Sequence, residues 1–157
     1  MISDPPVFES PARAALREAL TAGNRWRAIQ AARASLQVEP TIRNYHFLRK
    51  QIAHFQNQLS LKQYRVALLS SFTIEFIIDP LIVQGFLEGL DVEIYQAGFG
   101  QFRQEILDSS SGLYAFQPDL VVLACEGRDW MPGLYRDYLA NKSNSSAVLA
   151  QSASEAV

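Results

Sequence analysis

Three strand-like runs, separated by apolar helix patterns, place the strongest constraint on how this chain can fold. The runs are Val66-Ala67-Leu68-Leu69, Val92-Glu93-Ile94-Tyr95 and Leu120-Val121-Val122-Leu123-Ala124. The gaps between them are long enough for the helical crossovers that parallel strands require. The sequence therefore predicts a β-α-β-α-β unit with a parallel sheet, in which right-handed crossovers give the strand order 2-1-3.

The three runs differ in polarity, which predicts how each strand is covered. The first and third are almost wholly apolar, as is typical of parallel strands that are buried on both faces. Asp91-Val92-Glu93-Ile94, in contrast, alternates polar and apolar residues. We therefore expect the first and third strands to be covered on both faces and the second to be more exposed.

Residues 10–58 have the signals of a small helical array. Ser10-Pro11 is an N-cap followed by proline at the first helical position, and Gly23 closes that segment. Asn24 and Thr41 are the expected caps of a second and a third helix. In the second helix, four apolar residues are spaced to share one face: Trp26, Ile29, Ala32 and Leu36.

The net charge of −2 conceals an uneven distribution along the chain. Residues 1–66 carry 10 Lys/Arg and 4 Asp/Glu, a balance of +6, whereas residues 67–157 carry 4 and 12, a balance of −8. The arginines of the first part are spread over several helical turns. Nucleic-acid binding needs a dense basic patch with interleaved aromatic residues, so we expect no nucleic-acid partner.

Composition also excludes several kinds of site and location. One cysteine and two histidines allow neither an intrachain disulfide framework nor a zinc-ligand set, so we expect no metal site. The first residues lack the basic and apolar regions of a signal peptide, and no run reaches the roughly 20 apolar residues that cross a bilayer. These features predict a cytoplasmic protein without a membrane partner.

Polar or glycine-rich segments follow all three predicted strands. They are Ser70-Ser71-Phe72-Thr73, Gln96-Ala97-Gly98-Phe99-Gly100-Gln101 and Cys125-Glu126-Gly127-Arg128-Asp129-Trp130. Ligands of open α/β sheets bind beyond the carboxyl ends of the strands, near the point where the strand order reverses. With the order 2-1-3, these three loops would form one rim, which is the candidate site of this chain.

Each rim loop has both a structural and a functional interpretation. Gly98 and Gly100 of the second loop indicate positive φ or close backbone approach, and Gly-x-Gly alone is a poor signature of phosphate binding. The first-loop hydroxyls either cap a helix that begins near Ile74 or take part in chemistry. Cys125 is a small core residue or a nucleophile, and no histidine follows residue 54 to activate it or to complete a Ser-His-Asp triad. Glu126 is a surface ion-pair partner of Arg128 or an acid with a tuned pKa.

Two stretches make the resemblance to a known family specific. "VALLSSFTIEFI" and "VEIYQAGFGQFRQEILDSSSGLYAFQPDLVVLACEGRDW" resemble the N-terminal region of the FkbH-like proteins. That resemblance implies an α/β domain related to the SGNH hydrolases, placed before a haloacid-dehalogenase-type phosphatase domain. The fold class is then α/β: an N-terminal helical array in residues 1–60, followed by a small three-layer parallel-sheet domain of SGNH/flavodoxin-like type in residues 61–157, which we expect to be incomplete at its C-terminus.

The resemblance also names candidate residues at the rim. Ser71 corresponds to the hydrolase serine, Gly100 to the glycine of the second block, and Glu126-Gly127 to a block that supplies oxyanion donors in the hydrolases. The set departs from the hydrolase pattern, because Gly-Asp-Ser and the asparagine of the third block are missing, and the histidine block would follow the chain's end. Five neighbouring residues are candidate ligand-binding positions: Ser70, Thr73, Gly98, Gln101 and Arg128.

FkbH-like proteins dephosphorylate a three-carbon glycolytic donor and load a glyceryl unit onto an acyl carrier protein in polyketide-type biosynthesis. Their phosphatase chemistry uses Mg²⁺ and an Asp-x-Asp pair, yet no two aspartates of this chain stand two positions apart. The resemblance thus implies no cofactor in this chain, Mg²⁺ only in a phosphatase domain beyond residue 157, and that domain and an acyl carrier protein as partners.

Three functions are open at this point. The first is a non-catalytic N-terminal domain of an FkbH-like protein that positions its partner domain or docks the carrier protein. The second is a small SGNH-type esterase that uses Ser71. The third is a helical protein-interaction module whose α/β part is structural.

Overall fold

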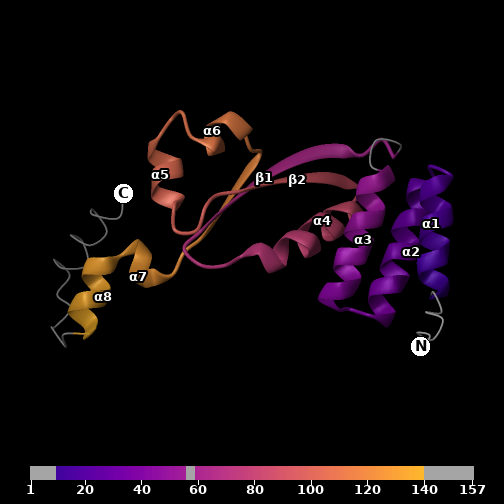
Figure 1. Ribbon diagram of the computed structural model, residues 1–157, viewed down its shortest axis with the longest axis horizontal. Helices are drawn as coiled ribbons and strands as arrows, with labels where there is room; N and C mark the ends of the chain where they lie inside the picture. The colour runs from indigo at the N-terminus through magenta and orange to yellow at the C-terminus, as the bar shows by residue number, and fades with distance from the viewer. Residues whose placement is uncertain (1–9, 56–58, 140–157) are drawn as a thin grey trace, which may run out of the picture. The chain divides into compact units, whose positions relative to one another are not determined.

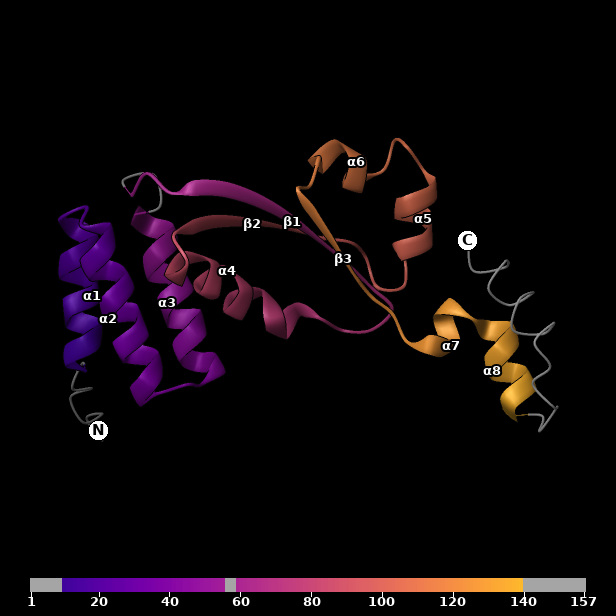
Figure 2. The same cartoon turned by 180° about the vertical axis from the view of Figure 1, so that it is seen from behind.

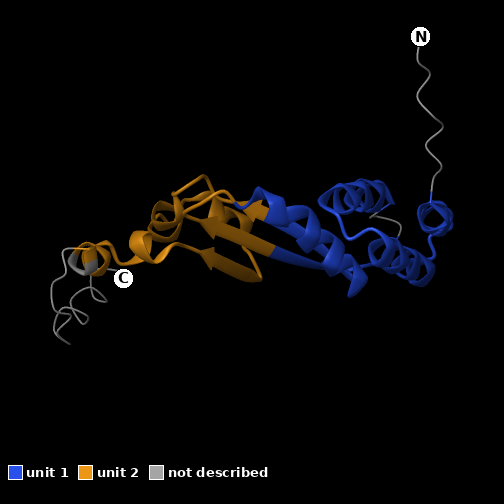
Figure 3. Ribbon diagram, turned by 90° about the horizontal axis from the view of Figure 1, so that it is seen from below, with its two compact units in different colours: residues 1–65, 74–94 blue, residues 66–73, 95–157 orange. Residues whose placement is uncertain are grey.

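The computed structural model describes residues 10–55 and 59–139, which form an α/β fold (Figure 1). These residues fall into two compact units, coloured separately in Figure 3. Residues 1–65 and 74–94 belong to unit 1, and residues 66–73 and 95–157 belong to unit 2.

Three helices begin unit 1, and their ends lie where the sequence predicts them. They are α1 (Pro11–Thr21), α2 (Arg25–Val38) and α3 (Ile42–Phe55). Side-chain oxygens of Ser10, Asn24 and Thr41 accept hydrogen bonds from the backbone N–H groups three residues later, which satisfies a donor at each helix start. Gly23 has a φ of +64°, a conformation that glycine adopts without strain as the chain leaves α1.

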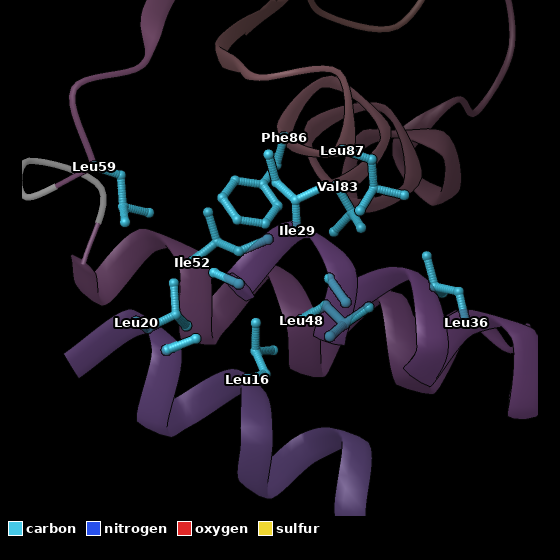
Figure 4. Close-up of a cluster of buried hydrophobic side chains, with 13 residues drawn as sticks. Leu16, Leu20, Ile29, Leu36, Leu48, Ile52, Leu59, Val83, Phe86 and Leu87 are labelled. Carbon is cyan, nitrogen blue, oxygen red and sulfur yellow. The ribbon is translucent and has the colours of Figure 1, made fainter. Parts of the chain in front are cut away.

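The core of unit 1 joins these three helices to a fourth, α4 (Ile78–Leu87), which follows the short 3₁₀ helix η2 (Glu75–Ile77). Buried leucine, isoleucine and phenylalanine side chains from all four helices meet in one cluster (Figure 4). Val83, Phe86 and Leu87 are the contribution of α4. Arg33 of α2 also donates to the Leu87 carbonyl oxygen, at 3.0 Å. For these reasons α4 groups with the N-terminal helices, whereas the sequence places it after a boundary at residue 60.

The predicted apolar face of α2 is wrong at its first position. Ile29, Ala32 and Leu36 are buried, but the Trp26 side chain is 68% exposed. Trp26 stands in the first turn of α2, beside the turn that connects α1 with α2. Spacing alone assigned Trp26 to the core, and it carried no information about how far the neighbouring helix extends.

Asn44 of α3 is a fully buried polar residue that bonds to both neighbouring helices. Its Nδ2 donates to the carbonyl oxygens of Ser35, at 3.1 Å, and Glu39, at 2.8 Å, at the end of α2. Its Oδ1 accepts from Arg13 Nη2 of α1, at 3.0 Å, and from the Ser35 hydroxyl, at 3.2 Å. Arg13 also pairs with Glu39 at 2.8 Å. This network satisfies the buried amide and fixes three helices to one another.

The Asp79 carboxylate connects α4 to α3. Its Oδ2 lies 2.7 Å from His46 Nδ1, and its Oδ1 accepts from Arg49 Nη1 at 2.6 Å. Burial raises the pKa of Asp79, but the hydrogen bonds and charges of His46 and Arg49 lower it by more, so its net pKa lies below the ordinary value of 3.8. The folded state therefore favours the ionised carboxylate.

The sheet has three strands in the order β2-β1-β3, as predicted. Figure 2 labels all three. They are β1 (Lys62–Ser70), β2 (Leu90–Gln96) and β3 (Leu120–Ala124), and they form a small parallel sheet. The β1–β3 register runs from Val66 opposite Leu120 to Ser70 opposite Ala124. The last five residues of β1 are all buried, as expected for the central strand.

The expectation that β3 is buried on both faces is wrong. Leu120 is 46% exposed, Val121 45% and Leu123 39%. In the part of the chain that the structure describes, β3 is an edge strand with only β1 beside it. An apolar run shows that a strand suits a buried position, but it does not supply the neighbours that would bury it.

Helices α5 (Phe102–Leu107) and α6 (Gly112–Phe116) form a small apolar core in unit 2 with the strands. Gly112 is required there, because a Cβ at this position would lie 2.2 Å from the Tyr95 hydroxyl oxygen. Glu105 accepts from the backbone N–H of Leu113 at 2.9 Å and also hydrogen-bonds the Tyr95 hydroxyl. Burial and then Glu105 raise the pKa of Tyr95, so its hydroxyl stays protonated as the donor.

Two short helices, α7 (Gly127–Trp130) and α8 (Pro132–Leu139), end the described part of unit 2. The predicted helix start at Pro132 is confirmed. The expected polar stretch 141–146 and the final helical segment lie outside the described residues. In residues 10–55 and 59–139, no helix combines the length and hydropathy needed to span a bilayer.

Substitution of Asn44 by alanine should destabilise the protein strongly. The change removes the Asn44 side-chain bonds to the Ser35 and Glu39 carbonyl oxygens, the Ser35 hydroxyl and the Arg13 guanidinium, which should lower the free energy of unfolding by about 2–4 kcal/mol. Urea denaturation followed by circular dichroism measures this change. Arg43→Ala, an exposed substitution on the same helix, is the control and should cost less than about 0.5 kcal/mol. If both variants lowered the free energy of unfolding equally, the Asn44 network would not contribute to stability.

The Asp79 ion pairs should make stability depend on acidic pH. Because the folded-state pKa lies below 3.8, this carboxylate adds stability that is complete above the unfolded-state pKa and is lost as the pH falls through the folded-state pKa. Asp79→Asn should therefore be less stable than the parent at pH 5, and the difference should shrink as the pH falls below 3.8. Urea midpoints across this range measure it, and a constant difference would contradict the assignment.

Candidate functional site

The three strand-end loops meet at the carboxyl end of the sheet, within unit 2. The Ser71 N–H donates to the Ala124 carbonyl oxygen at 3.1 Å, which continues the β1–β3 pairing beyond the last residue of β1. The Gly100 N–H donates to the Ser70 carbonyl oxygen at 3.1 Å and attaches the second loop to the first. Candidate residues from all three loops therefore lie at one rim.

Ser71 provides the side-chain bond between the first and third loops. Its Oγ accepts a hydrogen bond from the Glu126 backbone N–H, at 2.9 Å. The sequence separation of these two residues is 55 positions. The hydroxyl thus satisfies a backbone donor at a loop junction, a role that needs no neighbouring base.

Ser70 uses its hydroxyl within its own turn. Its Oγ accepts from the Phe72 N–H at 3.0 Å and also donates to the Phe72 carbonyl oxygen. The expectation that these hydroxyls cap the following helix is wrong, because η2 begins after Ile74 without a side-chain cap. Thr73 is exposed and makes no side-chain hydrogen bond among the described residues. Local serine turns thus compete successfully with helix capping here.

The second loop is a tight turn with Phe99 at its tip. The Gln101 N–H donates to the Gly98 carbonyl oxygen at 3.0 Å, and Gly100 has a φ of +69°. This conformation at the third position of a β-turn favours glycine strongly. A Cβ on Gly98 would lie 2.4 Å from Gln101 Oε1. Gly100 therefore has a conformational explanation that requires no phosphate ligand, whereas the Gly98 contact is with the end of a flexible side chain that can move away.

The third loop holds Glu126, Gly127 and Arg128 near the first. Arg128 Nε lies 2.6 Å from Glu126 Oε2, and both side chains are substantially exposed. The Glu126 carboxylate is thus paired with the guanidinium, while its backbone N–H is bonded to Ser71. Gly127 has open space where a Cβ would be, so its position does not require glycine.

Cys125 is half-buried beside the core of unit 2 and is a poor nucleophile. Burial and the charge of Asp129 raise the pKa of its thiol, and the Ser71 backbone and Arg103 offset this only in part. A raised pKa keeps the thiol protonated, whereas thiol nucleophiles need the thiolate. This geometry favours the structural interpretation of Cys125.

The second and third loops are also joined by the helices that follow them. Arg103 donates to the carbonyl oxygens of Asp129, at 3.2 Å, and Trp130, at 3.0 Å. Phe102 stacks on Trp130 with a ring-centroid distance of 6.2 Å. These contacts were not predicted, and the only sequence signal for them is an arginine beside an aromatic residue.

The rim lacks the components of a hydrolase site. Both histidines, His46 and His54, belong to unit 1, so unit 2 contains no imidazole base for Ser71. No group of three or more histidine, cysteine, aspartate or glutamate side chains suited to a metal ion occurs in the described ranges. The polar groups of the rim mainly hold the loops in place.

No protein-family model matches the sequence, and no curated protein matches it. Among solved structures, the chain is similar to the N-terminal part of the protein BF1531 from Bacteroides fragilis, which contains a phosphatase domain and was crystallised with Mg. The TM-score is 0.45 and the identity 25%, and the match covers 57% of this chain and 22% of that chain. The chain thus spans less than a quarter of that structural neighbour.

Substitution of Ser71 by alanine should loosen the junction of the first and third loops. The Glu126 N–H then loses its acceptor, which should cost about 1 kcal/mol and speed hydrogen exchange at that amide. NMR-detected exchange of the Glu126 amide measures the effect. Thr73→Ala removes a hydroxyl from the same loop without removing a described bond, and exchange there should not change. Unchanged exchange in Ser71→Ala would contradict the structural role.

Proposed function

We propose that this chain is a non-catalytic, N-terminal module of an FkbH-like protein. The complete protein would dephosphorylate a three-carbon glycolytic donor and load a glyceryl unit onto an acyl carrier protein. The module would hold a phosphatase domain and the carrier protein near each other. The proposal is supported by the two sequence stretches that resemble the family and by the chemistry of the rim.

One observation carries the non-catalytic assignment. The Ser71 hydroxyl accepts the Glu126 N–H and joins two loops, in a unit that contains no histidine. A serine nucleophile needs a base within hydrogen-bond reach to remove its proton. The Glu126 carboxylate is paired with Arg128 at 2.6 Å. Ser71 therefore suits a structural role better than an SGNH-type esterase.

The phosphatase step is assigned to another part of the protein. An Asp-x-Asp pair would supply the nucleophile and the general acid, with Mg²⁺ balancing the charge of the phosphoryl group. This chain has no aspartates at that spacing. Its own contribution would be to bring the acidic carrier protein close, since residues 1–66 carry a balance of +6.

Titration with an acyl carrier protein tests this proposal. The isotope-labelled chain, mixed with unlabelled carrier protein at low salt, should show NMR shift changes in the helices within residues 10–55. The changes should fade at moderate salt, because attraction between exposed charges is screened.

Two outcomes would overturn the proposal. One is the absence of shift changes at high carrier concentration. The other is hydrolysis of a simple ester by the chain that is lost in Ser71→Ala and retained in Thr73→Ala, which would favour the esterase function.

A further inference from the structure

Residues of α1, α2 and the turn between them line a groove on unit 1. It has a volume of about 540 Å³, a size that accommodates several side chains. Four alanines from α1, α2 and the turn between them line it: Ala15, Ala19, Ala22 and Ala31. Their small side chains leave an apolar surface into which a neighbouring protein can place larger ones.

Trp26 adds a solvent-exposed aromatic side chain to this groove. It belongs to the groove lining, and 68% of its side chain is exposed. A large exposed aromatic residue beside a concave apolar surface is typical of the central residues of protein interfaces. The indole would become buried if a partner's apolar side chains occupied the groove.

Two arginines flank Trp26 in the first turn of α2. Arg25 and Arg27 are exposed, and neither has an ion-pair partner in residues 10–55 and 59–139. The first turn of α2 contains no acidic residue. Because the helix dipole places partial positive charge at this end, cations are disfavoured here and an approaching carboxylate is favoured. Among the described residues, Glu18 supplies the only carboxylate that lines the groove.

We propose that this groove binds an acidic amphipathic helix of a partner protein. The apolar face of that helix would lie on the alanine surface and against Trp26, and its carboxylates would pair with Arg25 and Arg27. Binding of a helix in a groove through apolar residues at helical spacing is a common recognition mode. The inference rests on the carrier-docking role proposed above and assigns it to one surface.

A protein helix explains this surface better than a nucleic acid does. Trp26 and two arginines could stack on a base and pair with phosphates. The groove lining, however, contains one cation, Arg27, beside its four alanines, whereas a nucleic-acid site neutralises several phosphates.

Binding of a synthetic peptide to the full chain tests the proposal. The probe is a fluorescein-labelled helical peptide with leucine at i, i+3, i+4 and i+7 positions and glutamate on the remaining face. A matched peptide with lysine in place of glutamate and a single-stranded RNA oligonucleotide are the comparison ligands. Fluorescence anisotropy at low salt should show binding of the acidic peptide, with much weaker binding of the lysine peptide and the RNA.

Three variants locate the binding site. Trp26→Ala should weaken the affinity at least about tenfold, as for a central interface residue. Ala15→Leu fills the groove without changing any charge and should also weaken it. Arg25→Gln combined with Arg27→Gln should weaken binding and reduce its salt dependence. Arg43→Gln, which removes an exposed charge from α3, is the control and should bind like the parent.

The outcomes separate this inference from the function proposed above. Equal affinity of the groove variants and the parent, no binding of the acidic peptide, or tighter binding of the RNA would overturn the groove assignment. Urea midpoints close to the parent's would show that the variants are folded. If the peptide binds in the groove while the carrier protein does not, the groove assignment stands and the glyceryl-loading role fails. If the carrier protein binds equally well to the parent and to Trp26→Ala, the carrier-docking role stands and the groove assignment fails.

Discussion

The buried amide of Asn44 is the interaction on which the arrangement of the N-terminal helices depends. A primary amide in an apolar core is costly unless its donors and acceptor are all used, and here α1 and α2 supply the partners. Apolar side chains alone allow neighbouring helices to slide or rotate with little change in buried area. The directional bonds of Asn44 instead fix the start of α1 and the end of α2 relative to α3.

At the carboxyl end of the sheet, serine hydroxyl groups form the hydrogen bonds that hold the loops. Ser70 closes a local turn, and Ser71 attaches the third loop to the first. In a hydrolase, a serine at the end of a central strand would face a histidine base, but unit 2 has none. The rim therefore has polar strand ends whose hydrogen bonds serve the loop structure.

Much of the fold was predictable from local signals, because they act over a few residues. Caps at Ser10, Asn24 and Thr41 mark the helix starts, and the apolar runs with long gaps predict the parallel sheet and its order. The predictions that failed depended on contacts between residues that are far apart in the sequence. Trp26 and β3 have apolar sequences, but exposure depends on which elements lie beside them. Asn44 had no signal, since a single polar residue in a helix does not show where its partners are.

The rim of the sheet and the first turn of α2 differ in whether their polar side chains already have bonding partners within the chain. At the rim, both serines and Glu126 are committed to bonds within the chain, so a ligand that used them would have to break those bonds. At the first turn of α2, two cations and an indole are held by a capped helix without such bonds among the described residues. Their exposure leaves their interaction energy available to a partner, and the rigid helix end limits the entropy lost on binding. The helical surface is for this reason a better binding site than the strand ends that first suggest one.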